Sequence, residues 1–223
     1  ALIRTKLTEL GALNVANFYL VWRAIESLDK ADNGDKKEAQ LFRIINPMTK
    51  KWSAETGVYI TRESMELMGG LGYIEDGVLP KIMRDVMVLP IWEGSGNIIV
   101  LDMLRAFFKS EGFDTISAEI ERSAGSSAMH GDFLRNGLLE LKTFAERLKA
   151  LPQDEMEASA KPFFEQLTTL YQLSVLIDNL AEESKGWVEP SITFLKNRFA
   201  PTGLNGVKPL SVEEVNGLIA WQI

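Results

Sequence analysis

One carboxylate, that of Glu93, lies in the sequence between an aromatic ring and a flexible turn. It belongs to the run Trp-Glu-Gly-Ser-Gly-Asn at residues 92–97, which directly follows the apolar stretch 86–91. Apolar surroundings disfavour a charged carboxylate and raise its pKa, toward the range in which it can abstract a proton at neutral pH. The two glycines of the run let a ligand or another backbone segment come close. Glu93 is therefore a candidate general base.

A structural interpretation of the same turn stays open beside the chemical one. Ser95 would cap a helix that begins near Gly96, and Glu93 would be a favourable charge close to the positive end of that helix. Taken alone, the turn favours this structural interpretation, because such caps are common at the beginning of helices.

Composition restricts the other chemistry that is available. The chain contains no cysteine, which excludes disulfides and thiolate catalysis, and the single histidine, His130, excludes a multi-histidine metal site. We therefore predict no metal site. His130 belongs to the polar stretch 123–132, so we expect it at the surface. The absence of cysteine suits a reducing compartment, and we expect a cytoplasmic protein.

The charge is distributed unevenly along the chain. Of 223 residues, 46% are hydrophobic and 25% charged, which is typical of a folded domain, and the net charge is −7. Residues 1–111 have a net charge of −1 and residues 112–223 of −6. An acidic second half argues against binding to nucleic acid, which depends on neutralised phosphates. No apolar stretch approaches the length of a membrane span.

The hydrophobic pattern indicates an all-α protein, because no stretch alternates with the period of a strand. In the first half it predicts helices at 2–31, 36–68, 79–89 and 97–109. The first two are long and joined by a short polar turn, so we expect an antiparallel hairpin. The last two flank the Glu93 turn. Residues 1–111 are therefore predicted to form an antiparallel helical bundle.

The same pattern predicts which faces of these helices are buried. In the first helix the apolar stripe consists of Leu7, Leu10, Asn14, Phe18, Val21, Trp22, Ile25 and Leu28. In the second it consists of Leu41, Ile45, Met48, Trp52 and Tyr59, and Pro47 is expected to kink the helix or divide it in two. In the helix at 97–109 the face consists of Ile98, Leu101, Leu104 and Phe108.

Residues 112–223 are predicted to be an acidic helical extension. Small residues at 123–127 indicate a linker or loop, and helices are expected at 130–150, 155–184 and 189–199. The longest of these has an apolar face made of Leu170, Leu173, Leu176, Ile177 and Leu180. Residues 219–221, Ile-Ala-Trp, are expected to dock on the helices.

Three features of the first half follow one another in a specific order: Gly-Gly-Leu-Gly-Tyr at 69–73, Arg-Asp at 84–85, and Ile-Trp-Glu-Gly-Ser at 91–95. Each alone is weak, since a glycine turn commonly ends a helix and an Arg-Asp pair is commonly an ion pair. Together they closely resemble the C-terminal domain of the acyl-CoA dehydrogenase family, over residues 2–107. Glu66 and Ser95 stand where the family has glutamine and threonine.

The resemblance implies the all-helical third domain of a flavoprotein. Glu93 would remove the α-proton of an acyl-CoA thioester while FAD takes a hydride from the β-carbon, and the Glu93 N–H would stabilise the thioester oxygen. The implied cofactor contacts are Gly69, Gly70, Ser95 and Asn97, with the two glycines near the FAD of a neighbouring subunit, and the implied substrate contacts are Trp92 and Gly94. The resemblance also implies a homodimer or tetramer, without naming the electron acceptor.

The motif at 92–97, followed by Leu-Asp-Met-Leu-Arg at 101–105, resembles the branch of the family that includes alkylation-response proteins. Within it, Asp102 and Arg105 are spaced for an ion pair on the helix surface. Family members carry a helical and a β-domain upstream, which this chain lacks, so we expect the C-terminal part of a longer enzyme that is inactive alone. Two alternatives remain: a non-catalytic oligomerisation or interaction domain with a vestigial Glu93, and a DNA-associated alkylation-response protein.

Overall fold

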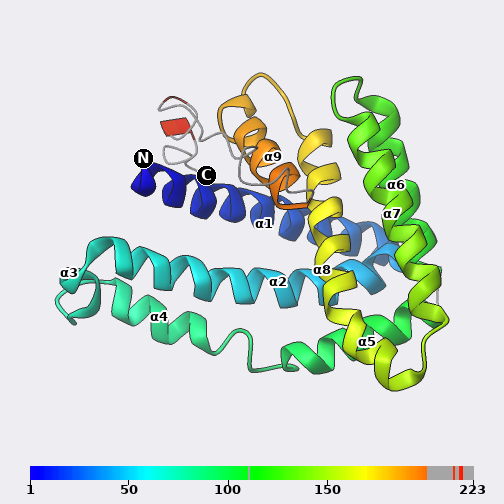
Figure 1. The fold of residues 1–223 in the computed structure, drawn as a ribbon, viewed down its shortest axis with the longest axis horizontal. Helices are drawn as coiled ribbons and strands as arrows, with labels where there is room; N and C mark the ends of the chain where they lie inside the picture. Colours follow the sequence, from blue (N-terminus) through cyan, green and yellow to red (C-terminus); the bar gives the residue numbers. More distant parts are fainter. Residues whose placement is uncertain (110, 200–212, 214–215, 218–223) are drawn as a thin grey trace.

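The computed structural model describes residues 1–109, 111–199, 213 and 216–217 (Figure 1). Within these residues the regular elements are helices and no strand occurs, which confirms the all-α fold class. The helices are α1 (Leu2–Asp32), α2 (Lys36–Met68), α3 (Gly70–Tyr73), α4 (Leu79–Met87), α5 (Gly96–Lys109), α6 (Gly112–Ser126), α7 (Gly131–Lys149), α8 (Gln153–Asp178) and α9 (Lys185–Phe199). None of the described helices combines the length and the apolar character needed to cross a membrane.

The two longest helices, α1 and α2, form the predicted antiparallel hairpin (Figure 1). The turn between them is encoded locally: Gly34 adopts a left-handed φ of 94°, and Asp35 caps α2 by accepting hydrogen bonds from the N–H groups of Lys37 and Glu38. Pro47 lies inside α2, which continues through it as one helix. A division of the segment at Pro47 is therefore wrong.

The buried face of α1 matches the predicted stripe only in part, with Leu10 buried as predicted. Leu13, Leu20 and Ala24 are buried, whereas Trp22 is 54% exposed and Ile25 is also exposed. Helix α1 contacts α2, α8 and α9, so its packed face is set by three partners that the local sequence does not show. Because apolar residues occur around most of this helix, periodicity alone does not identify the buried face.

The other predicted faces have different outcomes. In α2, Leu41, Ile45 and Met48 are fully buried, as predicted. In α5, Leu104 is buried, but Ile98 and Phe108 are exposed. The core face of α5 instead consists of Ile99, Val100, Met103, Leu104, Ala106 and Phe107. Here too the helix is apolar on more than one side, and its contacts with α2 and α8 select the face that is buried.

Helices α3 and α4 lie along the distal half of α2, at the end of the hairpin away from α6–α9 (Figure 1). This end of the molecule exposes many large apolar side chains. They are Leu67, Met68, Leu71, Tyr73, Ile74, Val78, Ile82, Met87, Val88, Leu89, Ile91 and Trp92. Exposed large apolar side chains gathered on neighbouring elements are typical of an interaction site.

The small-residue segment at 123–127 is not the predicted linker, because residues 112–126 form helix α6. Ser123 and Ala124 are buried, and the backbone of Gly131 in α7 passes so close that a Cβ there would lie 2.3 Å from the Ala124 carbonyl oxygen. The small residues serve the close packing of α6 on α7. A patch of such residues is therefore ambiguous between a loop and a tight helix contact.

The helices after residue 111 share a hydrophobic core with the bundle. The ring of Phe107 in α5 meets those of Phe163 and Phe164 in α8, at centroid distances of 5.3 and 6.3 Å. Helix α8 is buried along much of its length, including Leu170, Leu173, Leu176 and Ile177 of the predicted face, but it ends at Asp178, earlier than predicted. The division of the chain at residue 111 stays a prediction, and residues 219–221 lie outside the described residues.

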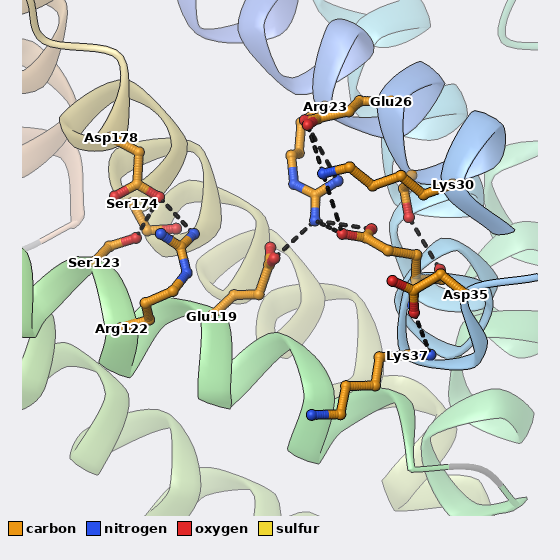
Figure 2. A network of polar contacts seen from close by, with 12 residues as sticks. Arg23, Glu26, Lys30, Asp35, Lys37, Glu119, Arg122, Ser123, Ser174 and Asp178 are labelled. Atoms are coloured by element: carbon orange, nitrogen blue, oxygen red, sulfur yellow. Dashed lines mark hydrogen bonds and ion pairs between the residues drawn. The ribbon is translucent and has the colours of Figure 1, made fainter. Parts of the chain in front are cut away.

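A polar network joins the hairpin to the second half of the chain (Figure 2). Its centre is Arg23 of α1, whose Nη2 lies 2.9 Å from Glu38 Oε2 of α2 and 2.7 Å from Glu119 Oε1 of α6. The hydroxyl of Tyr171 in α8 donates to Glu119 Oε2 at 2.6 Å. Burial, together with the Glu119 charge, raises the pKa of Tyr171 well above its usual value. The Arg23 guanidinium thus links α1 to α2 and α6, and Glu119 extends the network to α8.

His130 is buried, only 7% exposed, so its prediction as a surface residue is wrong. It immediately precedes α7 and is covered by α9, whose Lys196 Nζ lies 3.3 Å from its Nδ1. Burial and the Lys196 charge lower the pKa of His130. The polar character of residues 123–132 did not reveal this, because the covering helix is 66 residues away in sequence.

Candidate active-site turn

The Glu93 turn connects the end of α4 at Met87 to the beginning of α5 at Gly96. The Trp92 N–H donates to the Val88 carbonyl, and the Ser95 carbonyl accepts from the Ile99 N–H, both at 3.0 Å. Ser95 therefore occupies the position before the first turn of α5, as the structural interpretation of this motif predicts. The turn is a connection between two helices that both pack on α2.

Glu93 adopts a left-handed backbone conformation, with φ of 52°, and Gly94 follows with φ of 105°. Among the described residues, Glu93 is the sole non-glycine residue with a positive φ. For an L-residue this conformation costs about 1–2 kcal/mol, and such strained positions cluster at functional sites. The strain singles out the same residue that the sequence motif does.

Helix α2 supports the turn through two consecutive lysines. The Lys50 ammonium donates hydrogen bonds to the carbonyls of Trp92 and Gly94, at 2.9 and 2.7 Å. Lys51 is buried and forms an ion pair with Glu55. A Cβ at Gly96 would lie 3.0 Å from both Lys51 Nζ and Glu55 Oε1, so the close approach of α5 to this pair favours glycine. The sequence did not single out Lys50, because lysine is an ordinary residue on a long helix.

The side chains of the turn face solvent. Trp92 is 53% exposed, and Glu93, Ser95 and Asn97 are exposed as well. The predicted apolar pocket around Glu93 is therefore not formed by the described residues. The physical reason is that most of the stretch 86–91, expected to provide the pocket, is itself exposed instead of folding over the carboxylate.

The Gly69–Gly70 turn lies at the other end of α4, which is about 13 Å long at 1.5 Å per residue. Gly69 closes α2 with φ of 59°, and its N–H donates to the Glu66 carbonyl at 3.1 Å. A Cβ at either glycine would meet no atom within 4 Å. The structure thus separates the glycine turn from Glu93, and packing within the chain leaves open space at Gly70.

Arg84 and Asp102 form ion pairs with partners other than the nearby residues of opposite charge that the sequence suggests. Arg84 forms a bidentate pair with Glu75, at 2.6 and 3.1 Å, and not with its neighbour Asp85. The hydrogen bonds lower the pKa of the Glu75 carboxyl. Asp102 pairs across helices with Arg43, at 3.1 and 3.2 Å, and not with Arg105. In both cases a partner on another segment offers a better approach than the nearest residue of opposite charge.

No group of three His, Asp or Glu side chains in the described part of the chain is arranged to hold a metal ion. The site therefore consists of a strained carboxylate-bearing turn, its lysine support and an exposed apolar border. Such an arrangement can present one carboxylate to a ligand that approaches from outside the chain.

The sequence profile described as "Acyl-CoA dehydrogenase, C-terminal domain" matches residues 1–108. Residues 1–108 belong to the acyl-CoA dehydrogenase family. This confirms the resemblance predicted from the ordered motifs at 69–73, 84–85 and 91–95.

Two curated relatives extend the match beyond the acyl-CoA dehydrogenase domain. Acyl-CoA dehydrogenase family member 11 of Caenorhabditis elegans is 27% identical over 168 residues, which are 70% of this chain and 27% of that protein. The putative acyl-CoA dehydrogenase AidB of Escherichia coli K12 is 35% identical over 130 residues, 58% of this chain and 24% of that protein. The matches thus span about a quarter of the length of these relatives.

A solved acyl-CoA dehydrogenase structure shows that the fold likeness includes most of the second half. The crystal structure of Caenorhabditis elegans ACDH-11 in complex with C11-CoA has a TM-score of 0.73, covers 93% of this chain and 37% of that chain, and is 24% identical in sequence. At this identity the likeness establishes the fold alone. The helical arrangement after residue 111 therefore has a counterpart in a protein of the same family.

Proposed function

We propose that this chain is the C-terminal part of an FAD-dependent acyl-CoA dehydrogenase-like oxidoreductase, in which Glu93 is the base. The observation that carries the proposal is the left-handed Glu93 turn, with its exposed carboxylate, in a domain of this family. A base must reach its proton, and an exposed carboxylate on a supported turn meets that geometric requirement. The reaction would be α,β-dehydrogenation of an acyl-CoA thioester.

Each residue of the turn has a proposed part in this chemistry. Glu93 accepts the α-proton, which the thioester carbonyl makes acidic, and the Glu93 N–H donates to the developing negative charge on the thioester oxygen. Trp92 and Gly94 border the acyl group. FAD, when bound, supplies the acceptor for the hydride that leaves the β-carbon. Water near the proton transfer would be excluded by the apolar border of the turn.

One feature of the proposed cofactor residues suits a flavin: the backbone of the two glycines is open to an outside group. Among the described residues, no atom other than those of each glycine's chain neighbours and its own helix backbone lies within 4 Å of a Cβ built at Gly69 or Gly70, and Gly70 does not need a left-handed φ. Neither packing nor backbone conformation within the described residues requires glycine at position 70. The absence of a side chain there suits the close approach of an outside group to the backbone. The exposed Ser95 hydroxyl and Asn97 amide are the proposed polar contacts at the other turn.

The proposal requires parts that this chain does not contain. Matches cover only about a quarter of the relatives, and the described residues do not enclose Glu93. We therefore infer that the 223-residue chain is inactive alone and that upstream domains and a second copy complete the site. The exposed apolar end formed by α3, α4 and the turn supports such assembly as a homo-oligomer. A cytoplasmic location belongs to the same proposal.

The test uses the full-length protein that carries this chain. Acyl-CoA oxidation is measured with an artificial electron acceptor for the wild type and Glu93→Gln, with flavin content determined from the absorption spectrum. Loss of a general base lowers turnover by roughly 10²–10⁴-fold. Glu93→Gln should show this loss while it retains flavin, whereas Glu75→Gln, which removes an exposed carboxylate beside Arg84, should not. Full turnover in Glu93→Gln would refute the proposal.

A second function is favoured by one specific observation. Trp22, Ile25 and Leu28 form an exposed apolar row on α1, far in sequence from the Glu93 turn. A non-catalytic interaction domain would use such a row to bind a partner or a second copy. If the full-length protein binds no flavin but oligomerises through this row, so that Trp22→Glu disperses the oligomer, this second function is favoured. The acidic second half argues against DNA association, which we do not propose.

A further inference from the structure

We propose that Lys50 is a positioning residue for Glu93, holding the turn in the conformation that presents the carboxylate. The inference rests on the proposed function for its catalytic meaning, but its structural part stands on contacts within the chain. The hydrogen bonds of Lys50 go to backbone carbonyls of the turn, so its proposed role is to hold the backbone. Its effect on the reaction would be transmitted through the backbone of residues 92–94.

The first argument is the placement of the two hydrogen bonds. The Lys50 ammonium binds the carbonyl oxygen of Trp92 at 2.9 Å and that of Gly94 at 2.7 Å, which are the residues on either side of Glu93. One cation thus holds the peptide group between Trp92 and Glu93 and the one between Gly94 and Ser95, which flank the strained segment. Because a carbonyl oxygen that accepts from a charged donor is held more strongly than one that accepts from a neutral donor, the contact opposes relaxation of the turn.

The second argument is that the turn requires an external support. Glu93 has a left-handed φ of 52°, and such conformations persist only when the surrounding structure imposes them. The hydrogen bonds of Trp92 N–H to Val88 and of Ile99 N–H to the Ser95 carbonyl secure the flanks of the turn. The carbonyls of the central residues 92 and 94 are secured by Lys50.

The third argument is the rigidity of the element that carries Lys50. Helix α2 is one continuous helix that packs against α1, α4 and α5. The next residue, Lys51, is buried beneath Gly96 at the beginning of α5 and is paired with Glu55. Two consecutive residues of α2 therefore fix the middle and the end of the turn, so α2 sets the position of Glu93 relative to the bundle.

The first arm of the test uses the 223-residue chain and needs neither flavin nor substrate. Amide hydrogen exchange is followed in peptides covering residues 88–97 for Lys50→Met, Lys50→Arg and the control Lys36→Met, an exposed lysine at the beginning of the same helix. Lys50→Met should speed exchange of the turn at least about tenfold, because two hydrogen bonds from a charged donor are lost. Lys50→Arg keeps donors and should stay near the wild type, as should Lys36→Met. The midpoint of thermal unfolding serves to separate local from global loosening.

The second arm uses the flavin-containing full-length protein and separates turnover from binding. Displacement of a catalytic group by about 1 Å can lower a rate about 10²-fold. Lys50→Met should therefore lower kcat by roughly tenfold to a hundredfold with unchanged flavin content and little change in KM, and Lys50→Arg should restore most of kcat. If exchange of the turn in Lys50→Met equals that in Lys36→Met, the inference is overturned. A loss of kcat that Lys50→Arg does not restore also overturns it.

The two proposals fail in different ways. If Glu93→Gln keeps full turnover while Lys50→Met accelerates exchange, the proposed function fails and the role of Lys50 in holding the turn stands. If Glu93→Gln abolishes turnover while Lys50→Met changes neither exchange nor kcat, the function stands and the positioning role fails.

Discussion

Replacement of Arg23 by methionine is expected to destabilise the protein strongly, because it removes the cation at the centre of a network that links four helices. The guanidinium, 11% exposed, lies between Glu38 and Glu119, and Glu119 also accepts the Tyr171 hydroxyl. Methionine fills much of the same volume but leaves two largely buried carboxylates facing each other. Figure 2 shows Glu119 of α6 pointing toward Arg23, and Glu38 of α2 lies 2.9 Å from the same guanidinium.

The magnitude follows from the burial of the partners. Removing one member of a buried ion pair costs about 3–5 kcal/mol, because the remaining charge is left desolvated. Glu38 keeps a contact with Lys30 at 3.7 Å, and each carboxylate retains some exposure, so we expect about 3 kcal/mol for Arg23→Met. Glu119→Gln in the same background should recover part of this loss, since it removes one of the opposed charges.

Urea unfolding followed by circular dichroism measures these changes as free energies of unfolding. Arg43→Met is the matched control, because Arg43 pairs with Asp102 on the surface and an exposed pair contributes at most about 1 kcal/mol. The reasoning would be refuted if Arg23→Met lost less than about 1 kcal/mol. It would equally be refuted if the losses from Arg23→Met and Glu119→Gln simply added, since charges that share a contact must be coupled.

Two further predictions concern the fold. The buried His130 has a lowered pKa in the folded state, so the unfolded chain binds more protons. The free energy of unfolding should therefore fall as the pH drops below about 6.5. His130→Gln should flatten that part of the pH profile of urea midpoints. An unchanged profile would mean that His130 titrates alike in both states. Gly72→Ala should lower the free energy of unfolding by about 2 kcal/mol, because a Cβ would lie 2.4 Å from the Met65 carbonyl oxygen. Gly57→Ala, inside α2 with open space around it, should instead stabilise the protein by about 0.5–1 kcal/mol in the same assay. Equal effects of the two alanines would contradict the packing at Gly72.

What the sequence predicted correctly depended on local signals. The hairpin is bounded by Gly34 and Asp35 at one end and by Gly69 at the other. The two glycines act through their left-handed backbone conformation, and Asp35 acts through its capping side chain. The buried faces of α1 and α5 were predicted only in part, because both helices are apolar on more than one side and distant partners select the face. Helix α6 was missed for a related reason, since small residues that permit close packing also resemble a loop.

The candidate site likewise has one part that the local sequence predicts and another that depends on distant contacts. The Glu93 motif is contiguous and could be recognised, whereas its support by Lys50 comes from a residue 42 positions earlier in the chain. The burial of His130 under α9 is equally non-local. Periodicity and motif spacing contain no information on contacts of this kind, because they depend on how α2 and α9 are placed by the whole fold.

The exposure of Glu93 and the exposure of its apolar border have one common explanation. Met87, Val88, Leu89, Ile91 and Trp92 are all exposed, and they lead directly into the carboxylate. Since these residues are contiguous with Glu93, a surface that covers them also encloses the carboxylate and removes water from it. Enclosure raises the proton affinity that a base needs, so on the proposed function assembly and activation would be one event. The chain would then determine where the proposed base is held, and the surface that covers α4 would determine its environment.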